Sequence, residues 1–501
     1  MSCGYLVRNF FQLQAKQDHT MAENIKNERL NKNQSEKSSK ASRKPAPVLS
    51  VRQGQEMEIE ITGLGSTGEG VGRFGDIAVF VPGALTGEKV RVSAAFVKKN
   101  FIIGKLLEIM TASPHRVAPA CPVYEACGGC QLQHLSYEAE LQEKREQVKA
   151  ALERIGHLRG IRVMPTIGSE HPLYYRNKMQ FPVSGEKGRL QIGCFALNTH
   201  RVIDVTDCCI QKQKNNEIAA VVRAWMKQYR IMPYDEDRGT GLIRHIMGRV
   251  GVRTGEIMVC LVTAREEVPR LKELVKMLKA AIPGVKSVVQ NVNKRSTNVI
   301  LGEKTRLIAG EPNIKDKIGT LKFNISAQSF FQVNSEQAEK LYNTALEFAE
   351  LKGTETVVDL YCGTGTITLF MAQKAKRVLG IEIVPSAIRD ARKNAMANRI
   401  ENADFLLGDA AVEMPKLAAG GLRPDVVILD PPRAGCEERV LEAIVKVKPE
   451  RVVYVSCNPA TLARDLAYLH ERGFAIDKVQ PCDMFSRTHH VETVVLLTRK
   501  K

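Results

Sequence analysis

The stretch Val357-Val-Asp-Leu-Tyr-Cys-Gly-Thr-Gly365 decides the fold of this chain. Its apolar start is typical of a buried β-strand, and its two glycines let the backbone turn tightly and approach a ligand where the next helix begins. Helical stretches separate it from further apolar runs, which stand at 378–382, 404–407, 425–429 and 451–455, with a late run at 491–498. This alternation predicts a doubly wound parallel sheet in an α/β, Rossmann-like domain over residues 326–501.

A helix is expected just before this sheet. Asn334 can cap its start, with Gln337 three residues on. Apolar residues then repeat at helical spacing and would form one face: Ala338, Leu341, Tyr342, Ala345, Phe348 and Ala349.

Acidic residues that end successive strands indicate what the glycine turn binds. Glu382 ends the second strand, where a carboxylate can bond ribose hydroxyls, and Asp409 follows the third, where it can reach an adenine amine. The dinucleotide pattern G-x-G-x-x-G needs a third glycine where Thr368 stands, which disfavours NAD, and nothing resembles a phosphate-binding G-x-x-x-x-G-K-[ST] loop. A nucleoside without a phosphate chain is expected, and S-adenosylmethionine fits.

The motif Asp430-Pro-Pro-Arg433, which ends the fourth strand, narrows the kind of methyl transfer. Amino-methyltransferases have a similar motif, with an aromatic residue after the prolines that stacks on the target base. Arg433 stands at that position, which argues against N6-adenine methylation.

Ser456-Cys-Asn-Pro459 follows the last of the parallel runs and supplies a candidate nucleophile. A cysteine that ends an apolar strand is most often a small buried residue, and Cys362 in the glycine turn is interpreted so. For Cys457, the adjoining Asn-Pro forces a turn that would project the side chain at the edge where open α/β sheets present reactive groups. A thiolate that adds to carbon 6 of a pyrimidine makes carbon 5 nucleophilic enough to accept a methyl group.

A general base must then remove the proton from carbon 5 so that the thiol can leave. Glu492, in Thr488-His-His-Val-Glu-Thr493 on the last strand, is the candidate. An isolated Glu is usually a solvated surface residue, so this assignment depends on the neighbouring motifs.

The charge of the chain indicates a nucleic-acid partner. Its 501 residues, enough for two to four domains, include 73 Lys and Arg and 55 Asp and Glu, a net charge of +18. The first 50 residues hold nine basic and four acidic side chains, so +13 remains on the rest. A basic folded body favours RNA or DNA over a membrane surface, because phosphate contacts dominate nucleic-acid binding.

Neither a membrane segment nor an export signal is expected. No apolar run reaches the ~20 residues of a membrane helix, and the N-terminus lacks the apolar core of a secretion signal. Twelve cysteines in such a chain favour the reducing cytosol and metal or catalytic use. We therefore expect a cytoplasmic protein.

Three further regions precede the sheet domain. Residues 1–50 are predicted to be a disordered basic tail, and residues 51–110 a small OB-like β-barrel. Its expected strands alternate apolar and polar residues between glycine turns, at 57–61, 77–81, 88–92 and 102–106. Such barrels bind single-stranded nucleic acid, for which Lys98, Lys99 and Phe101 could serve, although ordinary solvated lysines in a turn explain them equally well.

Residues 111–325 are predicted to be a central α+β domain. An amphipathic helix is expected at 137–155, with Glu, Lys and Arg opposite one apolar face that comprises Leu141, Val148, Leu152 and Ile155. Short strands and one helix, near 269–281, are expected after it.

A cysteine cluster opens this central region. Cys121-x5-Cys127-x2-Cys130 and the distal pair Cys208-Cys209 supply four or five thiolates, and zinc and iron–sulfur sites both use four. The spacing differs from the C-x3-C-x2-C of radical enzymes, so a radical-initiating cluster is not expected. Spacing alone leaves zinc and a [4Fe-4S] cluster open.

The motifs resemble, in their order, those of the RNA (uracil-5-)-methyltransferases, and most of all the bacterial 23S rRNA enzymes with a TRAM barrel and a [4Fe-4S] cluster. They are Phe330-Phe-Gln-Val-Asn334, Asp359-Leu-Tyr-Cys-Gly-Thr-Gly365, Asp430-Pro-Pro-Arg433, Ser456-Cys-Asn-Pro459 and His490-Val-Glu492. The resemblance implies that S-adenosylmethionine is bound by Gln332, Tyr361, Glu382 and Asp430. Thr366 stands where some members have Asn, so its contact stays open.

The resemblance also implies the remaining roles. Cys457 would be the nucleophile and Glu492 the base. A [4Fe-4S] cluster would be held by Cys121, Cys127, Cys130 and Cys208, because the fourth ligand of the family stands in a C-x-I-Q context that matches Cys208-Cys-Ile-Gln211. The cluster would order a loop-rich domain without a redox step, and the barrel would be a TRAM domain.

The predicted function is transfer of a methyl group from S-adenosylmethionine to carbon 5 of uridine in 23S rRNA, by a monomer that acts on RNA. Two alternatives stay open, a tRNA uridine-5 methyltransferase and a non-catalytic RNA-binding assembly factor. A TRAM-containing radical methylthiotransferase is disfavoured by the cysteine spacing.

Overall fold

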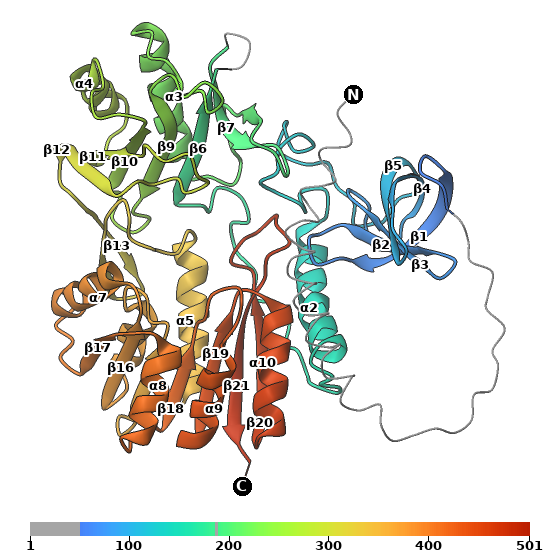
Figure 1. The fold of residues 1–501 in the computed structure, drawn as a ribbon, viewed down its shortest axis with the longest axis vertical. Helices are drawn as coiled ribbons and strands as arrows, with labels where there is room; N and C mark the ends of the chain where they lie inside the picture. Colours follow the sequence, from blue (N-terminus) through green and yellow to red (C-terminus); the bar gives the residue numbers. More distant parts are fainter. Residues whose placement is uncertain (1–50, 186–188, 501) are drawn as a thin grey trace. The chain divides into compact units, whose positions relative to one another are not determined.

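The computed structural model describes residues 51–185 and 189–500 (Figure 1). The tail predicted at 1–50 lies outside the described residues. The chain divides into two compact units. Of the described residues, the first holds 51–116, 125–131 and 195–201, and the second holds 117–124, 132–185, 189–194 and 202–500. Within the described ranges, every helix is too short or too polar to span a lipid bilayer.

The first unit contains a closed five-stranded barrel with the strand order β1-β2-β3-β5-β4. Its strands are β1 (Glu56–Leu64), β2 (Gly70–Phe74), β3 (Ile77–Val81), β4 (Lys89–Val97) and β5 (Phe101–Thr111). Alternate residues of β1 and of the first half of β4 are buried and form its core, as the period of two in the sequence predicts. The predicted barrel is confirmed.

The prediction of four strands is wrong, because it misses β2. Gly70-Val-Gly-Arg-Phe74 resembles a glycine turn in the sequence, yet it pairs with both β1 and β3. A Cβ on Gly72 would lie 2.4 Å from the carbonyl oxygen of Glu60. The close approach of β1 therefore requires glycine within this strand.

The second unit contains two seven-stranded sheets, of which the first belongs to the central region. Its order is β12-β11-β10-β9-β6-β7-β8. The strands are β6 (Lys178–Ser184), β7 (Gln191–Phe195), β8 (Val202–Asp204), β9 (Ile243–Val250), β10 (Ile257–Thr263), β11 (Val285–Val292) and β12 (Lys304–Gly310). A separate hairpin, β13 (Ile314–Ile318) with β14 (Leu321–Ile325), leads to the second sheet.

Two helices pack together beside this sheet, α3 (Gln213–Gln228) and α4 (Leu271–Ala281) (Figure 1). Only α4 is predicted, so the expectation of a single helix in this part is wrong. The start of α3 has no side-chain cap, and two of its buried residues, Asn215 and Asn216, are polar. A hydrophobic pattern with polar interruptions of this kind conceals a helix in the sequence.

The second sheet has the order β17-β16-β15-β18-β19-β21-β20. Its strands are β15 (Thr356–Leu360), β16 (Arg377–Glu382), β17 (Ala403–Leu407), β18 (Val426–Leu429), β19 (Arg451–Ser456), β20 (Phe474–Cys482) and β21 (Glu492–Arg499). The first five strands in this order are parallel, and β21 runs antiparallel to both β19 and β20. The predicted doubly wound sheet is confirmed, whereas β20 is missed because Pro481 and two charged residues interrupt its apolar pattern.

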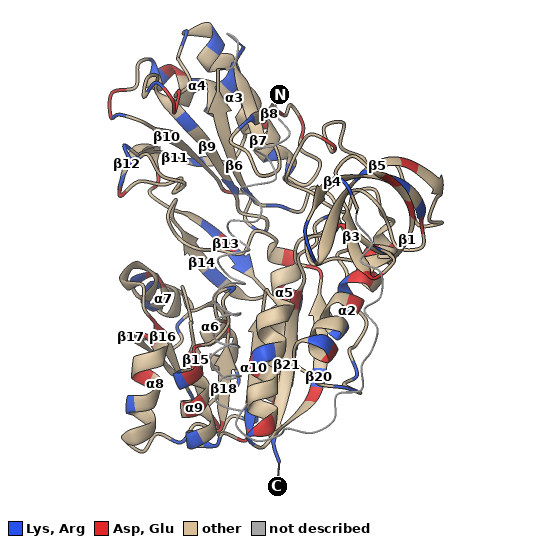
Figure 2. Ribbon diagram, turned by 45° about the vertical axis from the view of Figure 1, so that its right-hand side comes forward, with Lys and Arg blue, Asp and Glu red and all other residues tan. Residues whose placement is uncertain are grey.

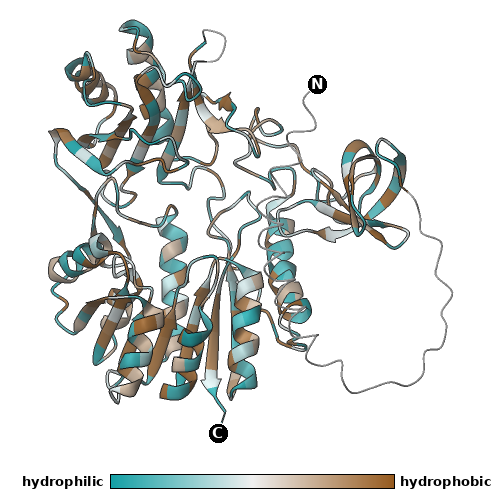
Figure 3. Cartoon of the chain, viewed as in Figure 1, coloured by the Kyte–Doolittle hydropathy of each residue, from teal (hydrophilic) through white to brown (hydrophobic). Residues whose placement is uncertain are grey.

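Helices cover both faces of this sheet, and the inner strands carry the brown of apolar residues in Figure 3. One core contains side chains of α5 (Ser335–Ala349), α6 (Thr366–Ala372) and α7 (Pro385–Ala397). The other contains side chains of α2 (Tyr137–Arg154), α8 (Ala410–Ala419), α9 (Glu438–Val447) and α10 (Pro459–Glu471). The predicted cap of α5 is confirmed, since the Asn334 side chain accepts a hydrogen bond from the backbone N–H of Gln337.

Helix α2 departs from the predicted pattern. Val148 and Leu152 are buried as expected, but Ile155 is 46% exposed. Glu140 and Lys144, which the sequence assigns to a solvated face, are fully buried. This part of the helix serves a polar network, and its burial therefore follows contacts that hydrophobic periodicity cannot reveal.

Candidate active site

The parallel strands bring most of the predicted cofactor ligands to one edge of the second sheet. Tyr361 follows β15, Glu382 ends β16, Asp409 follows β17 and Asp430 follows β18. Because the carboxyl ends of parallel strands lie at the same edge, these residues line the region where open α/β sheets bind ligands.

The two predicted catalytic residues come together through an antiparallel pair of strands. Ser456, the last residue of β19, lies opposite Thr493 of β21. Cys457 follows Ser456 and Glu492 precedes Thr493, and the charge of Glu492 acts on the Cys457 thiol. Adjacent antiparallel strands therefore place the proposed nucleophile and the proposed base side by side.

The Cys457 turn is fixed by its neighbours. Asn458 caps α10 by accepting from the backbone N–H of Ala460, and its Nδ2 donates to the carbonyl oxygen of Arg433 at 2.9 Å. Burial, and then the charges of Glu492 and Asp430, raise the pKa of the Cys457 thiol to about 11, whereas Arg433 lowers it. The resting site thus holds a protonated thiol within electrostatic reach of two carboxyl groups and one guanidinium.

The carboxyl groups of this site are buried and poorly neutralised. Burial raises the pKa of Glu492 to about 8, with a further contribution from Asp430 and an opposing one from Arg433. Burial also raises the pKa of Asp430 and of Asp359 to about 7 each. Asp359, which the sequence does not single out, accepts a hydrogen bond from the Thr368 hydroxyl at 2.5 Å.

Tyr342 of α5 joins this acidic group. Its side chain is only 3% exposed. Burial raises the pKa of its hydroxyl, Asp430 and Glu492 raise it further, and a side-chain hydrogen bond with Gln332 opposes the shift. Sequence periodicity assigns Tyr342 to the apolar face of the helix, and no local signal distinguishes it from an ordinary core residue.

Glu382 holds the glycine turn in place. Its Oε2 accepts from the backbone N–H of Gly363 at 3.1 Å, and its Oε1 accepts from that of Val384 at 2.8 Å. The carboxylate thus fixes the turn that begins with Tyr361, whose φ of 67° lies in the left-handed region.

The other predicted cofactor residues have local partners. Tyr361 forms a side-chain hydrogen bond with Cys436. Thr366 is the first residue of α6, and its hydroxyl lies 3.5 Å from that of Thr364. Asp409 caps α8 by accepting from the N–H of Ala411 at 2.9 Å. Each side chain therefore has a structural function besides any contact with a ligand.

Exposed apolar side chains stand beside these residues, and the sequence analysis misses them. Ile383 and Val384 follow β16, and Leu407 ends β17, all of them exposed. An apolar surface next to carboxylates suits a purine ring and its ribose. Phe330, two residues before Gln332, is 70% exposed and presents an aromatic ring to solvent.

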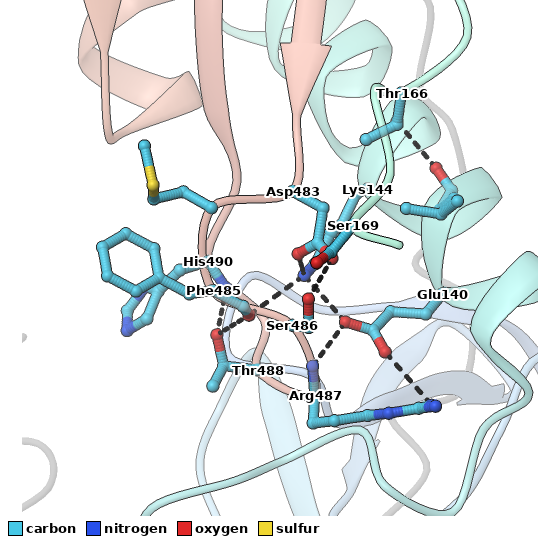
Figure 4. A network of polar contacts seen from close by, with 12 residues as sticks. Glu140, Lys144, Thr166, Ser169, Asp483, Phe485, Ser486, Arg487, Thr488 and His490 are labelled. Atoms are coloured by element: carbon cyan, nitrogen blue, oxygen red, sulfur yellow. Dashed lines mark hydrogen bonds and ion pairs between the residues drawn. The ribbon is translucent and has the colours of Figure 1, made fainter. Parts of the chain in front are cut away.

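The hairpin that connects β20 to β21 is held by a buried polar network (Figure 4). Lys144 of α2 is 1% exposed, and its Nζ donates to Glu140 at 2.8 Å and to Asp483 at 2.5 Å. The other oxygen of Asp483 accepts from the hydroxyls of Tyr137 and Ser486. The hairpin and α2 are therefore joined by one buried cation that two carboxylates share.

The same hairpin has several further anchors. The backbone N–H of Arg487 donates to Glu140 at 2.7 Å, and Arg487 adopts a φ of 68°. Gln337 of α5 donates to the carbonyl oxygen of Asp483 at 2.9 Å, and Tyr175 donates to that of Ser486 at 3.0 Å. These bonds fix the backbone that leads directly to Glu492.

Two histidines at the end of the hairpin are uncharged at neutral pH. Burial lowers the pKa of His489 to about 4 and that of His490 to about 3. The Nη2 of Arg433 lies 3.4 Å from the Nε2 of His490. The positive charge of Arg433, close to both histidines and to Cys457, opposes protonation of the rings.

The four predicted cluster ligands are divided between the two units. Cys127 and Cys130 belong to the first unit, and Cys121 and Cys208 to the second. Within the second unit, burial and then the neighbouring thiols of Cys121 and Cys208 raise the pKa of Cys209 to about 12. Across residues 51–185 and 189–500, no three His, Cys, Asp or Glu side chains are arranged to hold a metal ion.

The barrel residues predicted to bind nucleic acid lie near the start of β5. The Lys98 ammonium lies 5.1 Å from the ring centroid of Phe96, and the ring of Phe101 meets that of Phe80 edge to face at 6.0 Å. Lys99 stands in the turn between β4 and β5. These residues combine aromatic rings with positive charge on one connection of the barrel.

Two family models match the chain. The model described as tRNA (Uracil-5-)-methyltransferase matches residues 136–500, and the TRAM domain model matches residues 50–107. The sequence is 48% identical to an uncharacterized RNA methyltransferase of Clostridium tetani over 90% of this chain and 98% of that protein. It is 49% identical to another from Halalkalibacterium halodurans over 92% of this chain and all of that protein.

A solved structure shares the fold over most of the chain. It is the tRNA (uracil-54, C5)-methyltransferase of Pyrococcus abyssi in complex with S-adenosyl-L-homocysteine. The similarity has a TM-score of 0.71 at 28% identity and covers 88% of this chain and all of that one.

Proposed function

The chain belongs to the tRNA (uracil-5-)-methyltransferase family, as an S-adenosylmethionine-dependent RNA methyltransferase with a TRAM domain, and on that premise we propose that Cys457 and Glu492 methylate carbon 5 of uridine in 23S rRNA. One observation carries the assignment of these residues. Ser456 pairs with Thr493 in the register of β19 and β21, and Cys457 and Glu492 lie one residue beyond this pair, near enough for the charge of Glu492 to raise the pKa of the Cys457 thiol.

The residues at this edge fit S-adenosylmethionine, which supplies the methyl group and a positive sulfonium charge. Asp359, Asp430 and Glu492 are buried, and their raised pKa values indicate that a cation is needed to stabilise their ionised forms. We propose that Gln332, Tyr361, Glu382 and Asp430 hold the cofactor, with Asp409 and Thr366 near its nucleoside. The exposed Ile383, Val384 and Leu407 would pack against its base.

The proposed reaction begins at Cys457. Its thiol gives its proton to solvent, and the thiolate sulfur bonds to carbon 6 of the uracil, which places negative charge on the ring. Arg433 favours this thiolate. Carbon 5 then bonds to the methyl group as the bond from that methyl group to the sulfonium sulfur breaks and S-adenosylhomocysteine leaves, so that carbon 5 carries both the methyl group and its original hydrogen.

Glu492 completes the reaction. Its carboxylate takes the proton from carbon 5, the bond between carbon 6 and sulfur breaks, and the Cys457 thiolate is released. The base must be ionised at this step, although the pKa of Glu492 in the free protein is about 8. Ionisation of this carboxyl at neutral pH therefore depends on positive charge that arrives with the ligands.

The choice of 23S rRNA over tRNA rests on the cysteine pattern. The match with the P. abyssi tRNA enzyme covers 88% of this chain. Residues 117–501 alone are too few for this coverage, so the match extends into the residues before 117. The barrel therefore does not distinguish an rRNA enzyme from a tRNA enzyme. We propose a [4Fe-4S] cluster on Cys121, Cys127, Cys130 and Cys208, with no redox step. In its support, Cys121 and Cys208 lie close enough to Cys209 for their thiols to raise its pKa, so three of the cysteines are neighbours.

The test of the substrate uses RNA in which 5-fluorouridine replaces uridine. Fluorine cannot leave carbon 5 as a proton, so the covalent adduct with Cys457 persists on a denaturing gel. Anaerobically purified protein with S-adenosylmethionine is expected to form it with 23S rRNA fragments and not with tRNA. An adduct with tRNA alone would replace the proposed substrate, and no adduct with either RNA would favour a binding factor without activity.

The cluster is tested separately by iron and sulfide analysis of the anaerobic protein. Four irons and four sulfides per chain are expected, since a [4Fe-4S] cluster has that composition. Cys208→Ser should lower the iron content, whereas Cys209→Ser should leave it unchanged. A protein that retains zinc instead of iron would contradict the proposal.

A further inference from the structure

Two cations face each other on the central sheet, and neither forms an ion pair with any residue of 51–185 or 189–500. Lys178 of β6 and Arg249 of β9 are directly paired in the antiparallel register, so their side chains lie on the same face of the sheet. Like charges in such a pair destabilise a sheet, and opposite charges are the usual choice. Two positive charges at this position therefore indicate that negative charge from outside the sheet stabilises them.

A third cation joins the pair. Arg176 stands two residues before Lys178, and its Nε donates to the carbonyl oxygen of Lys178 at 3.2 Å. The charges of Arg249 and Arg176, after burial, lower the pKa of the Lys178 ammonium to about 7. The three cations thus lie close enough to repel one another.

Among the residues that the structure describes, no carboxylate pairs with this group. Within the described chain, none of the three side chains takes part in an ion pair, and Lys178 donates no hydrogen bond. Arg249 is only 4% exposed. Its Nη2 donates to the carbonyl oxygens of Ser329 and Ala327, whereas its buried Nε has no partner among the described residues.

The group lies beside the candidate active site. Asn177, between Arg176 and Lys178, donates to the carbonyl oxygen of Gln332 at 3.0 Å. Arg176 also contributes to the lowered pKa of His490, which in turn contacts Arg433. A polymer with its target base at Cys457 would therefore pass within reach of these cations.

We propose that Arg176, Lys178 and Arg249 bind a backbone phosphate of the RNA strand that carries the target uridine. This inference deepens the proposed function, because it assumes that RNA reaches Cys457. A phosphate suits the site, since its oxygens can accept from two guanidinium groups and one ammonium at once. The exposed Phe330, in the segment that Arg249 holds through Ser329, would meet a base of the same strand.

The other anion that could lie here is the carboxylate of S-adenosylmethionine. The three cations belong to β6, β9 and the segment before β6, and the only proposed cofactor ligand next to them is Gln332, whereas Glu382 ends and Asp430 follows a strand of the other sheet. This separation favours the RNA. The test therefore measures the affinities for RNA and for the cofactor independently.

The experiment measures the affinity of the full-length protein for a fluorescent oligouridylate over a range of salt concentrations. Lys178→Gln is expected to weaken binding several-fold and to reduce the slope of log K against log salt by about 0.7, the value for one single-strand phosphate contact. Lys178→Arg should retain the slope. The affinity for S-adenosylmethionine, measured by calorimetry, should be the same in all variants.

Lys317→Gln is the matched control. Lys317 is exposed on the hairpin of β13 and β14, where Figure 2 shows Lys and Arg in blue, and it faces Lys322 in the register without an ion pair within the described chain. Its replacement removes the same charge from the protein. A slope that changes equally in Lys317→Gln and Lys178→Gln would overturn the specific site.

A second measurement locates the phosphate. Neutral methylphosphonate linkages are placed one at a time along a 23S rRNA fragment, and the linkage that weakens wild-type binding should have no effect in Lys178→Gln. If Lys178→Gln weakens cofactor binding and spares RNA binding, the anion is the cofactor carboxylate and the inference is wrong. If both affinities are unchanged and thermal stability rises, the three cations have no ligand, and the inference is also wrong.

These readouts separate this inference from the proposed function. The salt dependence of binding does not require methyl transfer, so it can succeed in a protein that forms no adduct. A protein that forms the adduct and shows no change with Lys178→Gln would retain the proposed function and lose the phosphate site.

Discussion

The second unit buries two groups of like charges, and they differ in sign and in what can neutralise them. Asp359, Asp430 and Glu492 form an acidic group at the edge of one sheet, and their pKa values are raised. Lys178 and Arg249 belong to a basic group on the other sheet, and their pKa values are lowered to about 7 and about 10. Each group is unfavourable alone, which indicates that each awaits a ligand of opposite charge.

A third buried group shows the contrast. Glu140 and Asp483 are deeply buried, yet the two cations Lys144 and Arg487 neutralise them within the fold. This network positions the hairpin before Glu492 and needs no ligand. Buried charge thus marks a binding site in this protein only where the signs do not balance.

Removing the acidic charge at the reaction centre is expected to have the largest effect. Glu492→Gln should lower the rate of methyl transfer by about 10²–10⁴-fold, because the carbon-5 proton loses its acceptor. Unmodified RNA should then accumulate as a covalent adduct with Cys457, measured on a denaturing gel. Cys457→Ala in the same background serves as the control and should form no adduct. Rapid turnover by Glu492→Gln would assign the base to another residue.

Removing Lys144 from the buried polar network should lower the free energy of unfolding more than it changes the affinity for ligands. Lys144→Met leaves Asp483 and Glu140 buried without their cation and should cost about 3–5 kcal/mol of unfolding free energy. Denaturant unfolding measures this loss.

The matched control is Lys340→Met. Lys340 forms a surface ion pair with the exposed Glu170 at 3.4 Å, and its loss should cost less than about 1 kcal/mol. Equal effects of the two substitutions would show that the buried network does not stabilise the hairpin.

A change of pH should have opposite effects on the contributions of Glu492 and Lys178 to the stability of the fold. The folded pKa of Glu492, about 8, lies above its ordinary value of 4.5, so its effect on stability grows less favourable as the pH rises from 4.5 to 8. The folded pKa of Lys178, about 7, lies below its ordinary value of 10.5, so its effect grows less favourable as the pH falls from 10.5 to 7.

Two substitutions isolate these effects in thermal unfolding. The stability of Glu492→Gln relative to the wild type should increase between pH 5 and pH 8, and that of Lys178→Met should increase between pH 10 and pH 7. Curves that stay parallel to the wild type would show that neither group is strained in the free protein.

The positive charge of the cofactor should lower the raised pKa values of Asp430 and Glu492. Because a nearby cation lowers the pKa of a carboxyl, S-adenosylmethionine should release protons on binding near pH 7, where Asp430 and Glu492 are partly protonated. Calorimetry in two buffers of different ionisation enthalpy measures this release, and S-adenosylhomocysteine, which lacks the sulfonium charge, should release fewer protons. Equal release with both ligands would contradict the role given to the charge.

The smallest effect is expected from the tyrosine that borders the acidic group. Tyr342→Phe removes the hydroxyl that pairs with Gln332 and should weaken cofactor binding up to about tenfold, as for one hydrogen bond. Tyr229→Phe, which removes a hydroxyl from the partly exposed end of α3, should leave the affinity unchanged. An unchanged affinity in Tyr342→Phe would show that Tyr342 only packs in the core and does not contribute to cofactor binding.

The sequence by itself determined the elements whose pattern is local. Period-two alternation and glycine turns revealed most of the barrel, and apolar runs with glycine and proline motifs revealed six of the seven strands of the second sheet. The motifs around Cys457 and Glu492 named both residues, because covalent chemistry on uridine needs those side chains at strand ends. Their assigned roles stay predictions, as do the cluster ligands and the domain boundary at residue 325.

Only the tertiary structure decided which charges are buried and what surrounds them. Lys144, Tyr342, Lys178 and Arg249 resemble ordinary surface or core residues in the sequence, because their partners stand far away along the chain. The facing of Lys178 and Arg249 depends on the register of two strands that are separated along the chain by β7, β8 and α3. Electrostatic energy depends on distance in space, so a pattern along the chain cannot show where charge is left unbalanced.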